Sequence, residues 1–131
     1  MEMKITFEGK AKVNAEYKGI TIRTDQPAPS GDGSAPAPFD LFLASLGTCA
    51  GIYVKSFCDQ RGIATDDIYI TQSISGYDTD KKLISGIKID IHLPASFPEK
   101  YKDAIINAAS LCAVKRHLHD PPQIETVVTT I

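Results

Sequence analysis

The amino-acid sequence predicts a single α+β domain over residues 1–131, with the element order β-β-β-α-β-β-α-β. Three observations predict it. Short segments of alternating apolar and polar residues fill positions 3–23, a long stretch at 38–61 is apolar on nearly every side, and two further alternating segments flank a polar turn at 77–81. Alternation is typical of half-buried strands, and an apolar surface all round is typical of a buried helix. We therefore expect helices packed on antiparallel sheet.

The N-terminal region predicts a three-stranded meander. Apolar residues alternate with polar ones over residues 3–8, 13–17 and 20–23, and turns fall at Gly9 and Gly19. Residues 25–37 are rich in Pro and Gly, a composition that predicts a loop. A loop of this length inside a compact domain is often functional or in contact with a partner, but this one could equally be a plain linker.

The apolar stretch at 38–61 predicts a helix of about six turns. Pro38 suits a first helical turn, and Asp40 places a negative charge near the positive helix end. Gly62 is a residue that readily adopts the left-handed conformation at which helices stop.

This helix is expected to need contacts on more than one side. Small residues recur at spacings of three and four (Ala44, Gly47 and Gly51), which should let another backbone come close. A helix that is apolar all round cannot bury its whole surface against the sheet of so small a domain. We therefore expect a second copy of the chain as partner, in a homodimer.

The second half of the chain begins with the clearest local pattern. Residues 67–77 and 87–93 alternate and predict a long antiparallel hairpin. A capping box at Ser96 then predicts a second helix over 96–118. The β-branched residues of 123–131 predict a last strand.

Composition and charge exclude several classes of function. The net charge of −2, with 43% hydrophobic residues, gives no basic surface for nucleic acid or for an anionic membrane. Asp40, Lys55 and Asp59 interrupt the apolar stretch, so we expect no membrane span. The first residues are too polar for a signal peptide, and we expect a cytoplasmic protein.

Three cysteines without a signal peptide suggest a reactive thiol rather than a structural disulfide framework. Cys49 and Cys58 lie nine residues apart on one helix, on opposite faces. They are about 13 Å apart along its axis and cannot form a disulfide. Cys112 lies on the core-facing side of the second helix and can meet Cys49 if both helices pack over the same sheet. Cys58, near the polar helix end, is interpreted as a bystander.

A reactive thiol must be largely thiolate, and Cys49 lies about three turns into its helix, too deep to benefit from the helix dipole. Its activation would need a cation from another segment. The candidates are Arg116, Lys10, Arg23 and Lys55. Arg116 could instead simply complement the negative end of the second helix.

A metal site is an alternative use of Cys112, together with His117 and His119. The two histidines lie at a helix end before two prolines, and no further ligands lie nearby in the sequence. Structural zinc takes four ligands with paired short spacings. Metal binding therefore stays an alternative to thiol chemistry.

Two segments resemble the OsmC/Ohr family. Residues 36–54, PAPFDLFLASLGTCAGIYV, are similar to that family's central helix, in which a Pro, an acidic residue, an apolar run and small residues precede a Cys. Residues 110–114, SLCAV, resemble the segment around the family's second cysteine. The separation of 63 residues between Cys49 and Cys112, and the element order, are also similar to the family's.

The resemblance implies an OsmC-like fold, an intertwined homodimer with active sites at the subunit interface, and the thiol-dependent reduction of organic hydroperoxides in a stress response. Cys49 would be the peroxidatic thiolate, which attacks the peroxide and becomes a sulfenic acid. Cys112 would be the resolving thiol, which forms a disulfide that an external dithiol reduces. No cofactor or metal would be required.

Two positions depart from the family pattern. Characterised peroxidases of the family carry a Glu ten residues before the first Cys, which holds an Arg against the thiolate; this chain has Phe39 there, with Asp40 beside it. The family's Arg comes from the turn between the first two strands, where Lys10 keeps the charge but not the bidentate fork. Asp40, Lys10 and Arg116 are thus the candidate supporting residues. The alternative function is a fold relative without peroxidase turnover, either a redox sensor or a small-molecule-binding protein.

Overall fold

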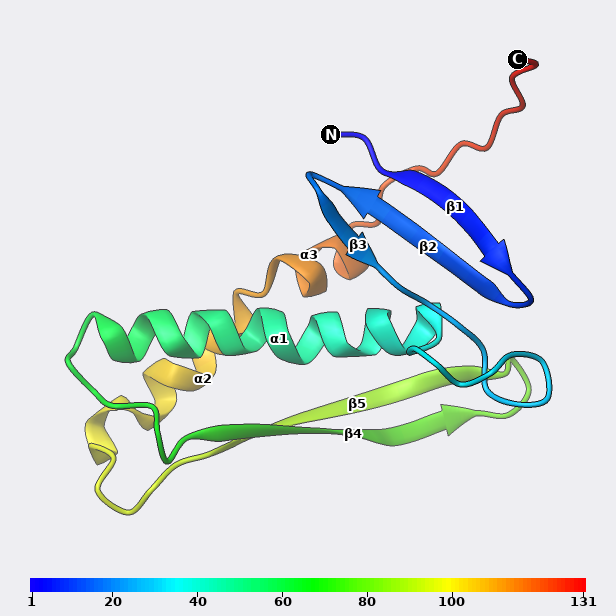
Figure 1. The fold of residues 1–131 in the computed structure, drawn as a ribbon. Helices are drawn as coiled ribbons and strands as arrows, with labels where there is room; N and C mark the ends of the chain where they lie inside the picture. Colours follow the sequence, from blue (N-terminus) through cyan, green and yellow to red (C-terminus); the bar gives the residue numbers. More distant parts are fainter. The chain divides into compact units, whose positions relative to one another are not determined.

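The computed structural model describes all residues from Met1 to Ile131 and has the predicted α+β architecture, with two antiparallel sheets (Figure 1). The chain forms two compact units, residues 1–45 and 46–131. The first contains a three-stranded sheet and a long loop, and the second contains a two-stranded hairpin with its helices. The expectation of a single domain over 1–131 stays a prediction.

The sheet of the first unit is the predicted meander. The strands β1 (Lys4–Gly9), β2 (Lys12–Tyr17) and β3 (Ile20–Ile22) pair antiparallel in that order. Between β2 and β3, Lys18 and Gly19 have φ values of 47° and 77°. Two positive φ values in a two-residue turn match the right-handed twist of the strands, which explains the Gly at this position.

One face of this sheet is apolar and largely exposed. The register places Ile5 opposite Ala15 and Ala15 opposite Ile22, so the alternating apolar residues share a face as predicted. Phe7 is 84% exposed and Ile20 is 64% exposed. This apolar face therefore has no complete cover in the single chain.

A buried carboxylate organises the loop at residues 25–37. Asp25 is fully buried, and its side chain accepts hydrogen bonds from the backbone N–H groups of Gln26 (2.7 Å), Asp32 (3.3 Å) and Ser34 (3.0 Å). The Ser34 hydroxyl also donates to it at 2.7 Å and contributes most to lowering the pKa of Asp25 to about 2. A Cβ on Gly31 would lie 2.3 Å from Asp25 Oδ1, so only glycine fits there. The loop is a bonded structure in its own right.

The helix α1 (Pro38–Asp59) begins at Pro38, as predicted. Asp40 Oδ2 accepts a hydrogen bond from the Ala37 N–H at 3.0 Å, which satisfies one of the donors that a helix start leaves unpaired. Beyond the helix end, Gly62 has a φ of 66°, in agreement with its predicted role as a stop signal.

By length and composition, α1 could cross a membrane. It has 22 residues, and a window within it has a mean hydropathy of 1.4. The three charges at Asp40, Lys55 and Asp59 therefore do not exclude a span by themselves, contrary to our expectation. Core helices of soluble proteins pass the same test. The buried residues of α1 are those of a core helix: Leu46, Ala50, Val54, Phe57 and Cys58.

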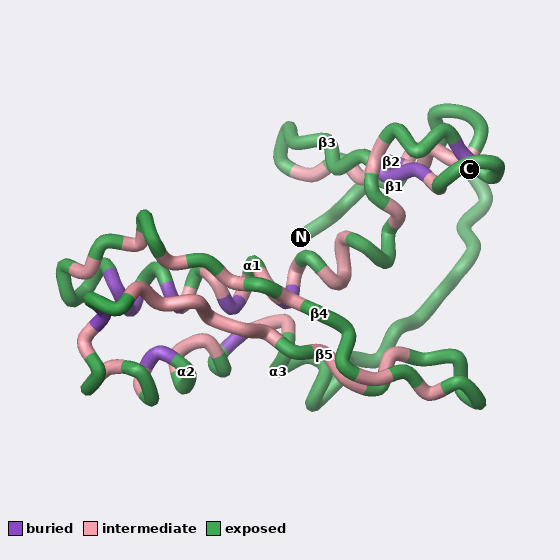
Figure 2. Tube along the Cα trace, turned by 90° about the horizontal axis from the view of Figure 1, so that it is seen from below, coloured by how far each residue is buried: buried purple, intermediate pink, exposed green.

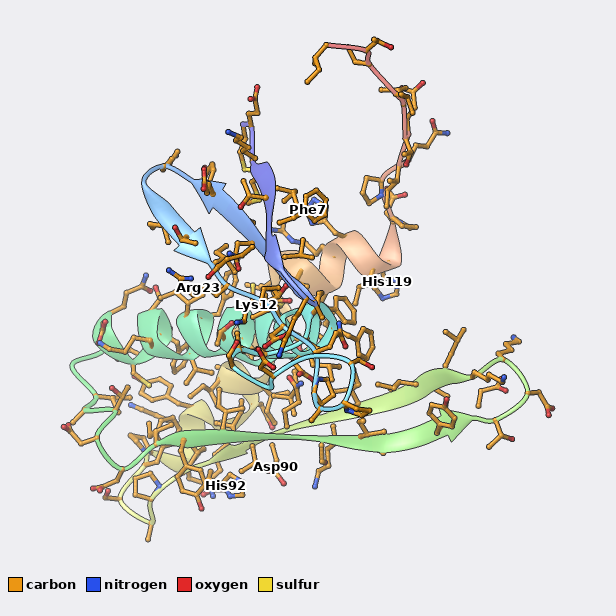
Figure 3. The ribbon with its side chains drawn as sticks, turned by 45° about the vertical axis from the view of Figure 1, so that its right-hand side comes forward. Phe7, Lys12, Arg23, Asp90, His92 and His119 are labelled. Carbon is orange, nitrogen blue, oxygen red and sulfur yellow. The ribbon has the colours of Figure 1, made fainter.

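The second unit is built on the predicted hairpin of β4 (Tyr69–Asp78) and β5 (Leu83–His92), which α1 covers on one face (Figure 1). A Cβ on Gly47 would lie 3.0 Å from Gln72 Oε1, and one on Gly51 would lie 3.9 Å from Ile70 Cδ1. The small residues of α1 thus permit its close approach to β4. Asp90 and His92 project from the other face of the hairpin (Figure 3).

The second helix of the prediction is in fact three pieces. A 3₁₀ turn at Glu99–Tyr101 leads into α2 (Lys102–Ser110), and α3 (Ala113–His119) follows after a break. The capping box expected at Ser96 is also wrong, because Pro98 occupies the cap position and no side chain caps it. On the core-facing side of α2, Ile105 is fully buried in the hydrophobic cluster that it forms with Val54, Phe57, Cys58 and Phe97.

The predicted last strand at 123–131 is absent. Residues 120–131 have no regular structure and are exposed along their whole length (Figure 2). Ile124 is 89% exposed and Val128 is 96% exposed. β-Branched residues favour a strand only where a neighbouring strand supplies hydrogen-bond partners, and this segment pairs with none in the single chain.

Candidate thiol site

Cys49 lies in the middle of α1, one residue before Ala50, which packs in the core. It is a free thiol of intermediate exposure. Its side chain is therefore held by a rigid helix while remaining partly accessible, which are the conditions a reactive cysteine needs.

Cys112 lies at the break between α2 and α3. Its ψ of 123° ends the helical backbone, and it becomes the N-cap of α3, where its Sγ accepts a hydrogen bond from the Lys115 N–H at 3.4 Å. The side chain is 2% exposed. Caps are usually made by the oxygen of Ser, Thr, Asp or Asn, and here a sulfur takes that place.

The two thiols meet, as the packing of both helices over one sheet predicts. The Cys112 side chain makes a hydrogen bond to Cys49 that lowers the pKa of Cys49. A thiol can donate a hydrogen bond through its S–H and accept one through its sulfur. Cys112 can therefore donate to Cys49 while its sulfur accepts from the Lys115 N–H.

The start of α3 stabilises the Cys49 thiolate. The backbone N–H of Val114 contributes most to lowering the pKa of Cys49, and burial opposes it. The Ala113 N–H lowers that pKa further. These are amides that a helix start leaves without partners inside the helix, and they carry the positive end of its dipole.

Arg116 adds the charge that the sequence led us to look for. Its positive charge also lowers the pKa of Cys49, after the hydrogen bonds. Arg116 stands with His117 and His119 in the last turn of α3, so it also complements the negative end of that helix. The two interpretations of Arg116 are compatible.

The backbone amides of Ala113 and Val114 were missed by sequence reasoning. Side-chain patterns do not reveal which amides are free, and a helix predicted to run unbroken through 112 leaves none. A cysteine at a cap position is also a weak sequence signal, because cysteine is not among the preferred caps.

The other candidate cations have partners elsewhere. In the first unit, Lys10 Nζ lies 2.6 Å from Asp32 Oδ1, and Arg23 Nη1 lies 3.2 Å from Glu8 Oε2. Lys55 pairs with Asp59 one turn along α1, at 2.6 Å. Asp40, the other supporting candidate, is bonded to the backbone of its own helix start.

Cys49, Cys112 and Arg116, with the amides of Ala113 and Val114, form what we call the thiol cluster. Cys58 and the histidines are not part of it. Cys58 is fully buried, and burial raises the pKa of its thiol, so it is poorly suited to nucleophilic chemistry. His117 Nδ1 lies 2.6 Å from the Ala113 carbonyl oxygen, within its own helix. No group of three or more potential metal ligands forms. The metal alternative therefore gains no support from the geometry.

A cavity of about 580 Å³ lies next to the cluster, between α1, β5 and α2. Its wall is mainly apolar and includes Ile89 of β5, Ile105 and Ala109 of α2, and Cys112. Cys49 is not part of this wall.

Comparison with known proteins agrees with the fold. The model of the OsmC-like protein family matches residues 31–127, a range that contains Cys49 and Cys112. No curated protein matches the chain.

Solved structures with the same fold are distant in sequence. A Psychrobacter arcticus protein named for osmotic stress induction and a detoxification response is 23% identical, with a TM-score of 0.72 over 87% of this chain and 85% of that one. An OsmC-like protein from Mycoplasma pneumoniae is 18% identical, with a TM-score of 0.65 over 92% and 87%. The organic hydroperoxide resistance protein OhrB of Bacillus subtilis is 20% identical, with a TM-score of 0.53 over 92% and 93%. At these identities the likeness establishes the fold.

Proposed function

Because the chain belongs to the OsmC-like protein family, we propose that it reduces organic hydroperoxides with thiols, Cys49 acting as the peroxidatic and Cys112 as the resolving cysteine. One observation carries the proposal: Cys49 has a lowered pKa and is hydrogen-bonded to the second thiol that the reaction needs. The name of the similar OhrB structure, an organic hydroperoxide resistance protein, points to the same substrate class.

The chemistry follows from the geometry in three steps. The Cys49 thiolate attacks an oxygen of the hydroperoxide, the O–O bond breaks, and Cys49 becomes a sulfenic acid. The departing alkoxide takes a proton from the solvent and leaves as the alcohol. The Cys112 thiol attacks the Cys49 sulfur, a disulfide forms and water leaves. An external dithiol then supplies two electrons and two protons, which restores both thiols.

The experiment follows consumption of cumene hydroperoxide by the purified protein with dithiothreitol as reductant. Cys49→Ser should abolish turnover, because it removes the thiol whose pKa the site lowers. Cys112→Ser should stop disulfide formation. Cys58→Ser is the matched control, since it removes the third thiol outside the cluster, and it should keep turnover. Absence of consumption by the unaltered protein with several dithiols would contradict the proposal.

A redox sensor or a small-molecule-binding protein is the second candidate. The observation that favours it is Phe39, which stands where the family's peroxidases have Glu, is 55% exposed and stacks on Phe42 at 5.4 Å. A sensor would form the Cys49–Cys112 disulfide with one equivalent of hydroperoxide yet show no turnover with dithiols. A binding protein would show neither reaction.

We also infer a cytoplasmic homodimer. Supporting the dimer are the apolar face of the first sheet, the unpaired C-terminal segment, and Ile52 on α1, which is 62% exposed. Such surfaces are costly to leave in water. Sedimentation equilibrium tests the assembly, and a monomer at micromolar concentration would contradict it.

A further inference from the structure

The cavity beside the cluster reaches only one of the two cysteines. Its wall includes Cys112, whose side chain is also hydrogen-bonded to Cys49. Cys49 does not line the cavity. Of the two cysteines, a molecule in this space therefore lies against Cys112 and not against Cys49.

We propose that the external dithiol enters this cavity and attacks the Cys112 sulfur of the Cys49–Cys112 disulfide, expelling Cys49. The inference deepens the proposed function and rests on it, because it presupposes that disulfide. It assigns a role to a cavity that the peroxide step does not use.

The direction of attack agrees with the chemistry of exchange. A thiolate attacks a disulfide sulfur along the line of the S–S bond, from the side opposite the leaving sulfur. The new bond joins the reductant sulfur to Cys112, the Cys49–Cys112 bond breaks, and Cys49 leaves as a thiolate. The second thiol of the reductant then attacks its own bound sulfur, which releases Cys112 as a thiol and the reductant as a disulfide. Two electrons pass from the dithiol to the protein.

The leaving group also favours this direction. Exchange is faster when the departing thiol has the lower pKa. The amides of Ala113 and Val114 lower the pKa of Cys49, so the site that stabilises the thiolate for the peroxide step stabilises it again as the leaving group.

Two of the three charged groups of the wall, Lys102 and Lys115, are cations, which suits an incoming thiolate. Lys102 is paired with Glu99 at 2.6 Å, whereas Lys115 makes no ion pair. An unpaired cation beside an apolar space attracts an anion and favours the ionised form of a thiol. The wall also contains Asp90, which is paired with Lys88 at 2.9 Å, and Ser110. Its other residues are apolar, which suits the carbon chain of a small dithiol.

The first test maps the attacked sulfur. Diamide, which needs no peroxidase activity, makes the disulfide in the purified protein, and excess 2-mercaptoethanol is added for a short time before acid quenching and alkylation. Trypsin places the three cysteines in separate peptides, residues 24–55, 56–61 and 103–115. The mercaptoethanol adduct is expected on Cys112, with Cys49 alkylated. An adduct on Cys49, or failure of diamide to form the disulfide, would overturn the inference.

The second test fills the cavity. Ala109→Leu adds side-chain volume to its wall, whereas Asn107→Leu makes a matched addition to an exposed position of α2 outside it. Ala109→Leu should slow reduction of the preformed disulfide by dithiothreitol on the order of tenfold, because access to the attacked sulfur limits exchange. It should leave the single-turnover oxidation of Cys49 by cumene hydroperoxide unchanged, and Asn107→Leu should change neither rate. Slowing of both half-reactions, or of neither, would overturn the route.

A failed hydroperoxide assay is distinguishable from failure of this inference. The mapping starts from a chemically made disulfide and reports only which sulfur the thiol reaches. Loss of peroxide turnover with an adduct on Cys112 would refute the proposed function and leave the cavity route in place.

Discussion

The substitution Ala113→Pro tests whether backbone amides stabilise the Cys49 thiolate. Ala113 is the first residue of α3, where proline is well tolerated because the helix does not use that N–H. Cys112 before it has a ψ of 123°, a value that the residue preceding a proline readily adopts. Proline should therefore remove one N–H donor to Cys49 and leave α3 in place.

The expected size follows from the number of donors. Ala113 supplies one of the two backbone N–H groups that lower the pKa of Cys49, and Val114 supplies the larger contribution. A hydrogen bond contributes about 0.5–1.5 kcal/mol net, and ~1.4 kcal/mol corresponds to a tenfold change in an ionisation equilibrium. The ionisation constant of the Cys49 thiol should fall roughly three- to tenfold.

The assay is the pH dependence of Cys49 alkylation by iodoacetamide, followed by mass in the peptide of residues 24–55. Folding lowers the pKa of the Cys49 thiol, so removal of the Ala113 N–H donor must move the midpoint of Cys49 alkylation to higher pH. At a pH below the alkylation midpoint, the rate of reaction with cumene hydroperoxide should fall by the same factor.

Ala113→Ser is the matched control, because it changes the side chain and keeps the N–H. It should leave the alkylation midpoint where it is. If Ala113→Pro also leaves the midpoint unchanged, while circular dichroism shows the helix content retained, the reasoning about the amides is refuted.

Three further predictions concern parts of the chain outside the cluster. Gly31→Ala should lower the free energy of unfolding by about 2 kcal/mol in a urea titration, since its Cβ would lie 2.3 Å from Asp25 Oδ1; a loss below about 0.5 kcal/mol would contradict this. The hydrogen bonds of Asp25 lower its pKa from 3.8 to about 2. They therefore stabilise the loop above pH 3.8, and this stabilisation is lost as the pH falls toward 2. Amide hydrogen exchange in the loop measures this loss, and exchange that stays unchanged across that pH range would contradict the prediction. Cys58→Ala should lower the melting temperature, because it removes a sulfur from the core, and should not shift the alkylation midpoint of Cys49; a shift would show that Cys58 belongs to the cluster.

The fold could be predicted where local pattern and tertiary packing agree. The hairpin of β4 and β5 and the meander follow from alternation with a period of two, and the register pairs the residues that alternation places on one face. The start of α1 follows from Pro38 and Asp40. Proline lacks the N–H that a helix start leaves unpaired, and the Asp40 carboxylate accepts a hydrogen bond from the Ala37 N–H. Neither effect depends on what packs against the helix. Local chemistry decides these features, so the sequence alone indicates them.

The features that were not predicted depend on partners distant in sequence. Residues 110–112 contain neither Gly nor Pro, and the features found at the helix break are the thiol cap and the hydrogen bonds to Cys49. The strand propensity of 123–131 is real, but a strand needs a neighbour whose position no local pattern gives. Arg116 could be proposed from its spacing to Cys112, since one helical turn is a local distance.

The helix break and the chemistry of the site have the same origin. In a continuous helix, the N–H groups of residues 113 and 114 would bond to the carbonyl groups four residues earlier and could not reach Cys49. Because the backbone leaves the helix at Cys112, these amides are free, and the residue that frees them also carries the second thiol. A substitution that restores the helix through 112 would keep both cysteines and still raise the pKa of Cys49. The presence of the two thiols alone would thus not give Cys49 its lowered pKa, and the break between α2 and α3 is the structural feature that accompanies them.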